Sequence, residues 1–410
     1  MPRFISVLVL CGVIAAACEP AAEPIPQSTL TTTVTSPAAD PKELIVVSTV
    51  TGSIVVHEAT GEEVVRLDPP EGHLFRQPTW LDASTVVFSE ISESGNHSLS
   101  AMDAATGVVA WRAPMETPPF YFSPAPADGP YATTSLRNDP LGGGLIAEFV
   151  DATGGVTALS TESPFYTSWS ADGGSLAVHI AGQHLDIVHG DAAETILSDP
   201  GLFQTPVWVD AGLVTLRTVG GDQRLTVWND GVFSDVADVD GPVGFVAVRD
   251  LIAVQAIERP DAGSIAAGMR LQTLPLIPGG SLVVIELGTE DLQIVSDKLA
   301  VLYQWDRAGE RLLYATVGDA PLSLVWNMWS NGSNTELATF TLQPPWFQNL
   351  VPFFDQYAQS VHLWSASGEH IGYPSIVDRQ PVVVIQAVTG GDPVVIERAT
   401  WAAWAPPNGR

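Results

Sequence analysis

A repeated strand–turn–strand unit constrains this chain more than any other feature. Its clearest copy, residues 167–180, places Trp169 before an Asp-Gly turn, after which apolar residues alternate with small or polar ones. Asp can bond back to its own backbone, Gly accepts positive φ, and alternation indicates a half-buried strand. Similar units have their anchor residues at Trp80, Ala125, Trp169, Trp208, Phe245, Trp305, Trp364 and Trp404.

The spacing of these anchors predicts an all-β fold. Units that recur every ~40–50 residues are typical of β-propellers, which have about four to eight blades of four strands each. The intervals from Trp80 to Phe245 fit this period, and the longer ones from Phe245 to Trp364 indicate insertions. We predict a single propeller of eight blades, or seven if the degenerate copy at Ala125 or Phe245 is not a blade.

The two ends of the repeat region carry complementary half-units. The last unit stops at its turn after Trp404, whereas the first strand, residues 43–47, has no unit of its own. A propeller removes its open sheet edges by pairing its first and last strands in one blade. We therefore expect the strand near Ile45 to pair with the unit that ends at Trp404.

The anchors and their turns resemble the W-S-P-D-G repeats of WD40-like propellers of the TolB type. The resemblance covers residues 43–410 and implies the fold, but propellers host many unrelated activities. Residues 102–111 also look like the repeat of quinoprotein-type propellers, and Ser170-x-Asp172-x-Gly174 resembles a sialidase Asp-box. Each of these occurs as one good copy, which favours an ordinary hairpin and an ordinary turn.

Residues 1–17 have the pattern of an export signal. Arg3 precedes an apolar stretch, residues 4–14, and Ala15-Ala16-Ala17-Cys18 resembles a bacterial lipobox. Cleavage after Ala17 by ordinary signal peptidase is the alternative. The only other cysteine, Cys11, lies in the signal, so processing leaves Cys18 without a disulfide partner. We predict lipid attachment at Cys18 and a location in the cell envelope, outside the cytoplasm.

The segment that follows the signal is a predicted tether. Residues 18–42 are rich in Pro, Ala, Ser and Thr and lack aromatic residues, so they cannot form a core. The propeller is expected to occupy residues 43–410. The net charge of −29, with two lysines, excludes nucleic acid as a partner, because such binding depends on neutralising phosphates. We expect a monomer that contacts the membrane only through its lipid.

Motifs for catalysis or metal binding are missing from the sequence. It contains no G-x-S-x-G, P-loop, H-E-x-x-H or C-x-x-C pattern, so we assign no catalytic residue, metal ligand or cofactor. His179, His184 and His189 are spaced by five and should alternate between the faces of a strand, which favours separate structural roles. Asp235, Asp238 and Asp240 are interpreted as an acidic hairpin rather than a cation site.

Residues just before the anchors share one offset in the repeat, which should place them around the mouth of the central channel. They either form an exposed binding patch or insert between the blades, and the sequence favours neither. Together with the connector before Trp364, the candidate binding face consists of Phe75, Arg76, Tyr121, Tyr166, Phe203, Trp346, Phe347 and Phe354.

The function predicted from these observations is a binding or assembly module for a protein, peptide or glycan in the cell envelope. The alternative is a propeller enzyme or carbohydrate-binding protein, similar to glycosidases or quinoproteins, that uses the channel mouth. An aromatic rim favours binding, whereas a cluster of carboxylates or histidines at the channel would favour an enzyme.

Overall fold

The computed structural model describes residues 43–126, 129–160, 165–180, 183–190, 192–239, 243–256, 276–277, 280–289 and 291–407. All of them belong to one compact unit, residues 36–410. The predicted signal, Cys18 and the tether lie outside the described residues. Within the described part, no helix has the length and apolar character needed to cross a membrane.

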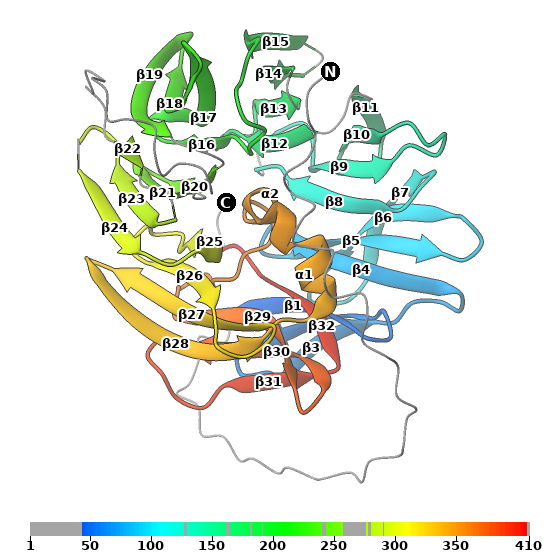
Figure 1. Cartoon of the computed structure of the whole chain (residues 1–410). Coiled ribbons are helices and arrows are strands. Elements are labelled where there is room, and N and C mark those ends of the chain that lie inside the picture. Colours follow the sequence, from blue (N-terminus) through cyan, green and yellow to red (C-terminus); the bar gives the residue numbers. More distant parts are fainter. Residues whose placement is uncertain are drawn as a thin grey trace. The chain divides into compact units, whose positions relative to one another are not determined.

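The described strands form eight antiparallel sheets arranged as the blades of a propeller (Figure 1). Blade 1 contains β1 (Leu44–Thr49), β2 (Ile54–Glu58), β3 (Glu63–Leu67) and β32 (Ala399–Trp404). Blade 2 contains β4 (His73–Trp80), β5 (Thr85–Ser92), β6 (His97–Asp103) and β7 (Val109–Met115). Blade 3 contains β8 (Pro119–Pro124), β9 (Thr133–Asn138), β10 (Leu145–Val150) and β11 (Val156–Ser160). Blade 4 contains β12 (Phe165–Trp169), β13 (Leu176–Ile180), β14 (His184–His189) and β15 (Ala192–Leu197).

The remaining blades follow the same order. Blade 5 contains β16 (Val207–Val209), β17 (Gly212–Val219), β18 (Asp222–Asn229) and β19 (Val232–Val239), with β22 (Leu276–Ile277) added in parallel beside β19. Blade 6 contains β20 (Val243–Val248), β21 (Leu251–Ala256), β23 (Leu282–Glu286) and β24 (Leu292–Ser296). Blade 7 contains β25 (Ala300–Trp305), β26 (Leu312–Val317), β27 (Ser323–Ser330) and β28 (Ser333–Thr341). Blade 8 contains β29 (His370–Val377), β30 (Gln380–Ala387) and β31 (Val394–Glu397).

The first strands of blades 2 to 7, and β32 in blade 1, face the channel. Contacts between blades run from first strand to first strand, as between β4 and β8, β12 and β16, and β16 and β20, which identifies them as the inner strands. In blade 8 the inner position is held only by an isolated bridge between Trp364 and Ile371. The predicted insertion at residues 258–280 falls between β21 and β23, and most of it lies outside the described residues.

Blade 1 closes the ring with strands from both ends of the repeat region. Ile45 pairs with Trp404 and Val46 with Ala403 in the antiparallel register of β1 and β32. The closing strand β32 also contacts β4 of blade 2, so no gap separates the first and last units. The predicted closure and the eight-blade count are confirmed, and pairing of the ends gives β1 a neighbouring strand on both of its edges.

The anchor tryptophans join neighbouring blades. They lie at the ends of the inner strands, and four indole N–H groups donate to a backbone carbonyl of the preceding blade's inner strand. These bonds are Trp80 to Ala403 (2.9 Å), Trp169 to Ser123 (3.1 Å), Trp208 to Ser168 (3.1 Å) and Trp364 to Gln304 (3.0 Å). Tryptophan therefore recurs at the anchor position because the same indole-to-carbonyl contact recurs between neighbouring blades.

Two isolated motifs have structural roles in the described chain. Ser170 Oγ donates to Asp172 Oδ1 at 2.6 Å, and the backbone N–H of Gly174 donates to the same oxygen, so this turn is closed on itself. Residues 102–111 span the hairpin between β6 and β7, in which Asp103 accepts bonds from Thr106. Both agree with the interpretation as a turn and a hairpin.

Candidate functional site

A short helical segment between β28 and blade 8 fills the mouth of the channel. It contains α1 (Pro344–Asn349), the 3-10 helix η2 (Val351–Phe353) and α2 (Phe354–Tyr357), and we call residues 343–362 the plug. Figure 1 shows α1 and α2 inside the ring of sheets. Pro344 and Pro345 start α1, where proline suits the first helical turn because it has no N–H to leave unpaired.

The plug buries one apolar stripe against the inner strands. Its buried side chains are Trp346, Leu350, Phe354, Tyr357 and Val361, spaced by four, four, three and four residues, and all belong to the largest core cluster. This spacing is that of a helix face. The sequence prediction treated the segment only as an aromatic connector and missed this signal.

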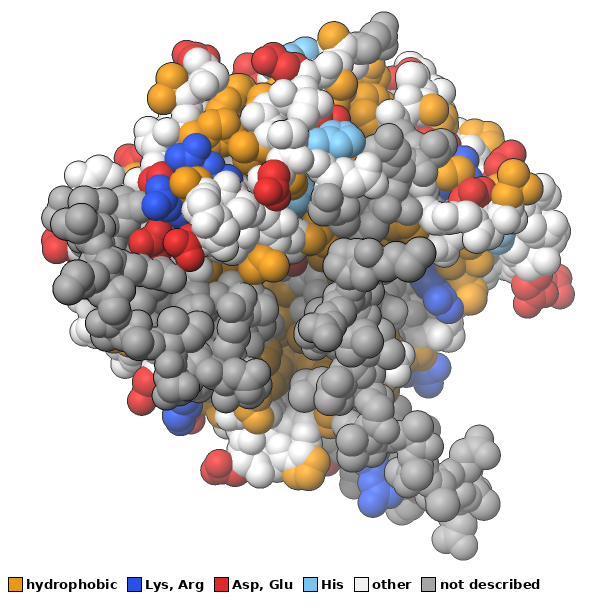
Figure 2. Space-filling model, turned by 45° about the horizontal axis from the view of Figure 1, so that its top comes forward, with side chains coloured by type: hydrophobic (Ala, Val, Ile, Leu, Met, Phe, Trp, Pro, Cys, Tyr) orange, Lys and Arg blue, Asp and Glu red, His pale blue; other side chains and the backbone are white. Residues whose placement is uncertain are grey.

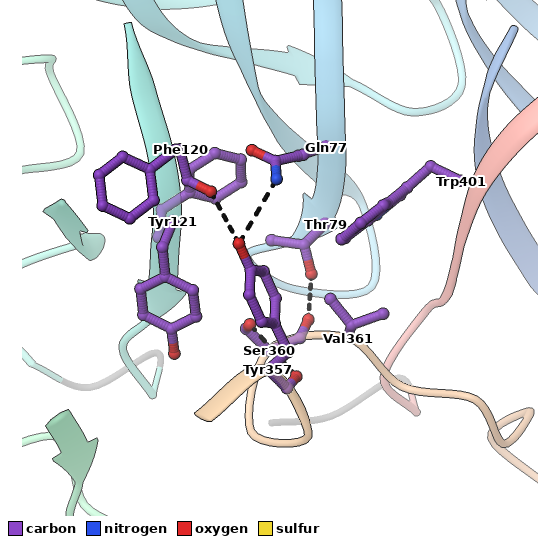
Figure 3. A pocket seen from close by; sticks show the side chains of 9 residues that line it. Gln77, Thr79, Phe120, Tyr121, Tyr357, Ser360, Val361 and Trp401 are labelled. Atoms are coloured by element: carbon purple, nitrogen blue, oxygen red, sulfur yellow. Dashed lines mark hydrogen bonds between the residues drawn. The ribbon is translucent and has the colours of Figure 1, made fainter. Parts of the chain in front are cut away.

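Gln356 and Tyr357 attach the plug to blades 3 and 4. Gln356 Oε1 accepts from the backbone N–H of Thr167 at 2.7 Å, and its Nε2 donates to the Thr167 carbonyl at 2.9 Å. The hydroxyl of Tyr121 donates to the carbonyl of Gln356 at 3.2 Å. Tyr357 donates from its hydroxyl to the carbonyl of Phe120 at 2.9 Å (Figure 3). These bonds satisfy backbone groups on the channel edge of inner strands.

Two further glutamines hold the ends of the plug. Gln343 Nε2 donates to the carbonyls of Ser375, Val382 and Ala399 at 2.8–3.0 Å, so the plug begins on blades 8 and 1. Gln304 of β25 donates to the carbonyl of Val361 at 3.0 Å, near the plug's C-terminal end. The plug therefore makes bonds to blades on several sides of the channel.

Four of the predicted binding-face rings are buried rather than exposed. Phe75, Tyr121, Trp346 and Phe354 are 1%, 3%, 0% and 6% exposed, which corrects the expectation that they form an open patch. The two inner-strand rings are buried in different ways. Tyr121 is covered by the plug, where it bonds Gln356 and meets the ring of Tyr357 edge-on. Phe75 packs on Phe88 of its own blade, with ring centroids 4.8 Å apart.

The other predicted face residues are spread over different environments. Tyr166 and Phe203 are half-buried and stack with their ring centroids 4.2 Å apart, while His179 meets Phe203 edge-on. Phe347 is half-buried beside the core cluster. Arg76 is exposed. The structure thus brings together the rings that face the plug and leaves Arg76 outside.

Asp355 places a carboxyl group among neutral hydrogen-bond donors at the mouth. Its Oδ2 accepts from Thr205 Oγ1 at 2.8 Å and from the side-chain amide of Gln204, both neutral groups. Burial raises the pKa of Asp355 above its usual value, and the hydrogen bonds from Thr205 only partly oppose this shift. Burial also raises the pKa of Tyr121 to about 12.

The described histidines and aspartates singled out in the sequence have partners other than a metal ion. His184 Nε2 lies 3.1 Å from Asp186 Oδ2, and His189 Nδ1 lies 2.9 Å from Ser175 Oγ. His179 Nδ1 is hydrogen-bonded to the carbonyl of Gln204. Asp235 and Asp238 pair with Arg217 and Arg224, whereas Asp240 lies outside the described residues. No group of three or more His, Cys, Asp or Glu in the described part could hold a metal ion.

Solved structures show what this arrangement is similar to. Dihydro-heme d1 dehydrogenase NirN aligns over 89% of this chain and 75% of its own, with 12% identity and a TM-score of 0.57. The C-terminal WD40 domain of Sif2 aligns over 87% of this chain and 92% of its own, with 10% identity and a TM-score of 0.52. The chain has the fold of an eight-bladed β-propeller. At these identities the likeness concerns the fold alone.

Two other comparisons give no closer relative. No family model and no curated protein matches the sequence. TolB from Acinetobacter baumannii aligns over 82% of both chains with 10% identity and a TM-score of 0.38, which is too loose to carry an argument. The function of this propeller must therefore be argued from its own residues.

One pocket among the described residues lies where the plug meets blades 1 to 3 (Figure 3). Its cavity volume is about 10 Å³, and its lining includes Gln77, Tyr121, Tyr357 and Trp401. Figure 3 shows the hydroxyl of Tyr357 bonded to Gln77 and to the backbone of Phe120 within this lining. Sites for small ligands usually have ~300–1,000 Å³, so this pocket is small for a substrate site.

Proposed function

We propose that this protein is a lipid-anchored propeller in the cell envelope, outside the cytoplasm, that acts as a binding or assembly module for another protein. The observation that carries the proposal is the plug. It covers the inner-strand rings at the channel mouth, so a partner meets the outer surface of the blades and the plug rather than an open channel. Flat outer surfaces suit macromolecules better than small substrates.

The point at which the chain enters the propeller supports this role. Ile45 at the start of β1 pairs with Trp404 at the end of β32, so the tether joins at the anchor-turn end of the strands. The carboxylate of Glu43 accepts from the Ser367 N–H at 2.9 Å in the turn after Trp364. The plug precedes Trp364 and lies at the opposite end, which we call the plug face.

An anchor at Cys18 would therefore leave the plug face free for partners. Residues 18–42 as a flexible chain have an r.m.s. reach of ~28 Å. A tether of this length attached at the anchor-turn end permits the plug face to point away from the lipid surface. A binding partner in the envelope could then reach the plug face without entering the space between the propeller and the membrane.

The anchoring part is tested by replacing Cys18 with Ser. The native protein should partition into the membrane fraction and the detergent phase, and Cys18→Ser should move it to the soluble fraction. Cys11→Ser, a change within the predicted signal, is the matched control and should leave the mature protein membrane-bound. A Cys18→Ser protein that stays in the detergent phase would contradict the proposal.

The binding part is tested by in-cell cross-linking from the two ends of the propeller. A photo-cross-linking residue at the exposed Gln348 of α1 should yield discrete adducts with another envelope protein. The same group at the exposed Asp250, in the turn between β20 and β21 at the opposite end, is the control. No adduct at Gln348, or the same adducts at Gln348 and Asp250, would contradict the proposal.

A further inference from the structure

Four exposed arginines of the described chain have no ion-pair partner: Arg76, Arg249, Arg379 and Arg398. They are notable because acidic residues outnumber basic ones by 46 to 17. On the face that Figure 2 displays, Asp and Glu side chains are more widespread than Lys and Arg side chains. An arginine left unpaired in an acidic protein is available to a carboxylate from outside the chain.

Three of these arginines lie on the plug face, on adjoining blades. Arg76 is near the start of β4, Arg379 is in the turn between β29 and β30, and Arg398 links β31 to β32. Backbone bonds connect the region. The N–H of Val50 donates to the Arg398 carbonyl at 2.8 Å, and the N–H of Phe75 donates to the Gly52 carbonyl at 3.0 Å.

The fourth arginine, Arg249, provides an internal comparison. It lies in the turn between β20 and β21, which follows the Phe245 anchor and is therefore at the opposite end of the strands. Its φ is 52°, its side chain is exposed, and it has no ion-pair partner among the described residues. It shares the local properties of the plug-face arginines without their position.

The turn at Arg379 uses a residue that its backbone does not favour. Asp378 and Arg379 form a two-residue hairpin loop with φ values of 48° and 65°, the pattern of a type I′ turn, whose second position favours glycine. Three other two-residue loops with positive φ at both positions have glycine there: Gly220-Gly221, Asp230-Gly231 and Asn331-Gly332. Arg379 therefore occupies a turn position where glycine is less strained, so replacing it with glycine removes the side chain without a backbone cost.

Apolar side chains are exposed beside these arginines, in the same strands and turns. Val50 in the β1–β2 turn is 43% exposed, Leu74 in β4 is 40% exposed, and Val377 at the end of β29 is 42% exposed. Leu74 lies against Gly52, where an added Cβ would come within 2.8 Å of its Cδ2 atom. We call the surface formed by Val50, Leu74, Arg76, Val377, Arg379 and Arg398 the arginine arc.

We infer that the arginine arc binds an extended segment of a partner protein in which carboxylates alternate with apolar side chains. This inference rests on the proposed binding function and names the surface and the chemistry of the partner. The planar guanidinium group matches a carboxylate with two parallel hydrogen bonds, and Arg is enriched among the residues that dominate interfaces. The exposed valines and leucine supply the apolar part of the same surface.

The charge of the whole chain favours a short peptide segment over an extended anionic surface. A membrane of anionic lipids presents many charges at once and is repelled by the net charge of −29. Asp378 and Glu397 flank two of the arginines in sequence and add to this repulsion. A segment with two or three carboxylates brings them within contact distance, where screening over ~8 Å at physiological salt weakens the distant acidic groups.

The test uses the full chain in detergent and a labelled peptide in which Glu alternates with Leu and Phe. Fluorescence anisotropy should show binding that weakens at least ~10-fold when Gln replaces each Glu, since charge-assisted bonds are about twice as strong as neutral ones. Arg379→Gly should reduce affinity by a similar factor without lowering the melting temperature, because glycine suits the turn. Arg249→Gly, the matched control, should leave affinity unchanged.

Each opposite result overturns the inference. Equal binding of the Glu and Gln peptides, or no binding of either, would show that the partner is not an acidic segment. Equal effects of Arg379→Gly and Arg249→Gly would show that the arginine arc is not the binding site. Binding of the Cys18→Ser chain to phosphatidylglycerol vesicles that Arg379→Gly abolishes would assign the arc to lipid. The membrane partition of the native chain and the cross-links from Gln348 report on the proposed function independently of these outcomes.

Discussion

Gln356 of the plug bonds both backbone groups of Thr167 with one side-chain amide, at 2.7 Å from the N–H and 2.9 Å to the carbonyl. It thereby occupies the position of a neighbouring strand on the channel edge of β12. Gln356 Nε2 also donates to the hydroxyl of Tyr121. A single glutamine of α2 thus satisfies both backbone groups of Thr167 in blade 4 and bonds the Tyr121 side chain of blade 3.

Replacing Gln356 with Ala should loosen the plug. The backbone N–H and carbonyl of Thr167 would lose their partners in a buried place, which costs about 2–4 kcal/mol in the free energy of unfolding. Denaturant unfolding measures this loss, and hydrogen exchange should rise at Thr167. Gln348→Ala, which changes an exposed glutamine of α1, should alter neither. A Gln356→Ala chain as stable and as protected as the native one would show that the plug is held by its apolar stripe alone.

The ion pair of Glu43 and His370 should make the ring closure sensitive to acid. Burial alone would raise the pKa of Glu43, but the hydrogen bonds from His370 and Ser367 outweigh it and hold the pKa at about 2. A depressed pKa stabilises the folded state above the carboxylate's ordinary pKa of 4.5, and this contribution is lost as the pH falls from there through about 2.

Comparison of Glu43→Gln with the native chain isolates this effect. The melting temperature of the native protein should fall more steeply between pH 4.5 and about 2 than that of the variant. Glu62→Gln, which removes an exposed carboxylate from blade 1, should follow the native curve. Parallel curves for Glu43→Gln and the native chain would contradict the assigned pKa shift.

Asp355 should have the opposite dependence on pH. Burial raises its pKa in the folded state. At a pH just above 3.8, the folded state therefore still holds the proton that the unfolded chain has released. Its stabilising contribution is complete below the ordinary value of 3.8 and decreases as the pH rises through the higher folded pKa. Asp355→Asn keeps an oxygen acceptor for Thr205 and removes the charge. The difference in unfolding free energy between variant and native chain should grow in favour of the variant as the pH rises from 3.8. A difference that stays constant with pH would show that the carboxylate is not destabilised by burial.

The indole N–H of Trp80 should contribute to ring closure. It donates to the carbonyl of Ala403 on the closing strand β32, at 2.9 Å in a buried contact. Trp80→Phe keeps an aromatic ring but leaves the carbonyl unpaired and a space beside it, at a cost of about 1–3 kcal/mol in unfolding free energy. Trp111→Phe on the outer strand β7, where the tryptophan is half-buried, should cost less. Equal costs would show that ring size, not the bond, determines the role of the anchor.

The propeller itself could be predicted from the sequence because its information is local and repeated. Each anchor tryptophan is followed by a turn and a strand. A unit whose pattern is clear therefore predicts the structure of the similar units next to it. The half-units near Ile45 and Trp404 also determined the closing pair, since a strand with one free edge needs a partner and only the other end of the repeat region offers one.

The plug and the state of the channel mouth depended on tertiary structure. The spacing of Trp346, Leu350, Phe354, Tyr357 and Val361 indicates a helix face in the sequence, but nothing in it says which surface that face covers. Tyr121 has the offset of a channel-facing residue whether a partner or the chain itself covers it. Its burial is decided by a segment more than 200 residues away, through the Tyr121–Gln356 bond with a separation of 235. A periodic pattern records which way a side chain points, whereas burial depends on what the rest of the chain brings opposite it.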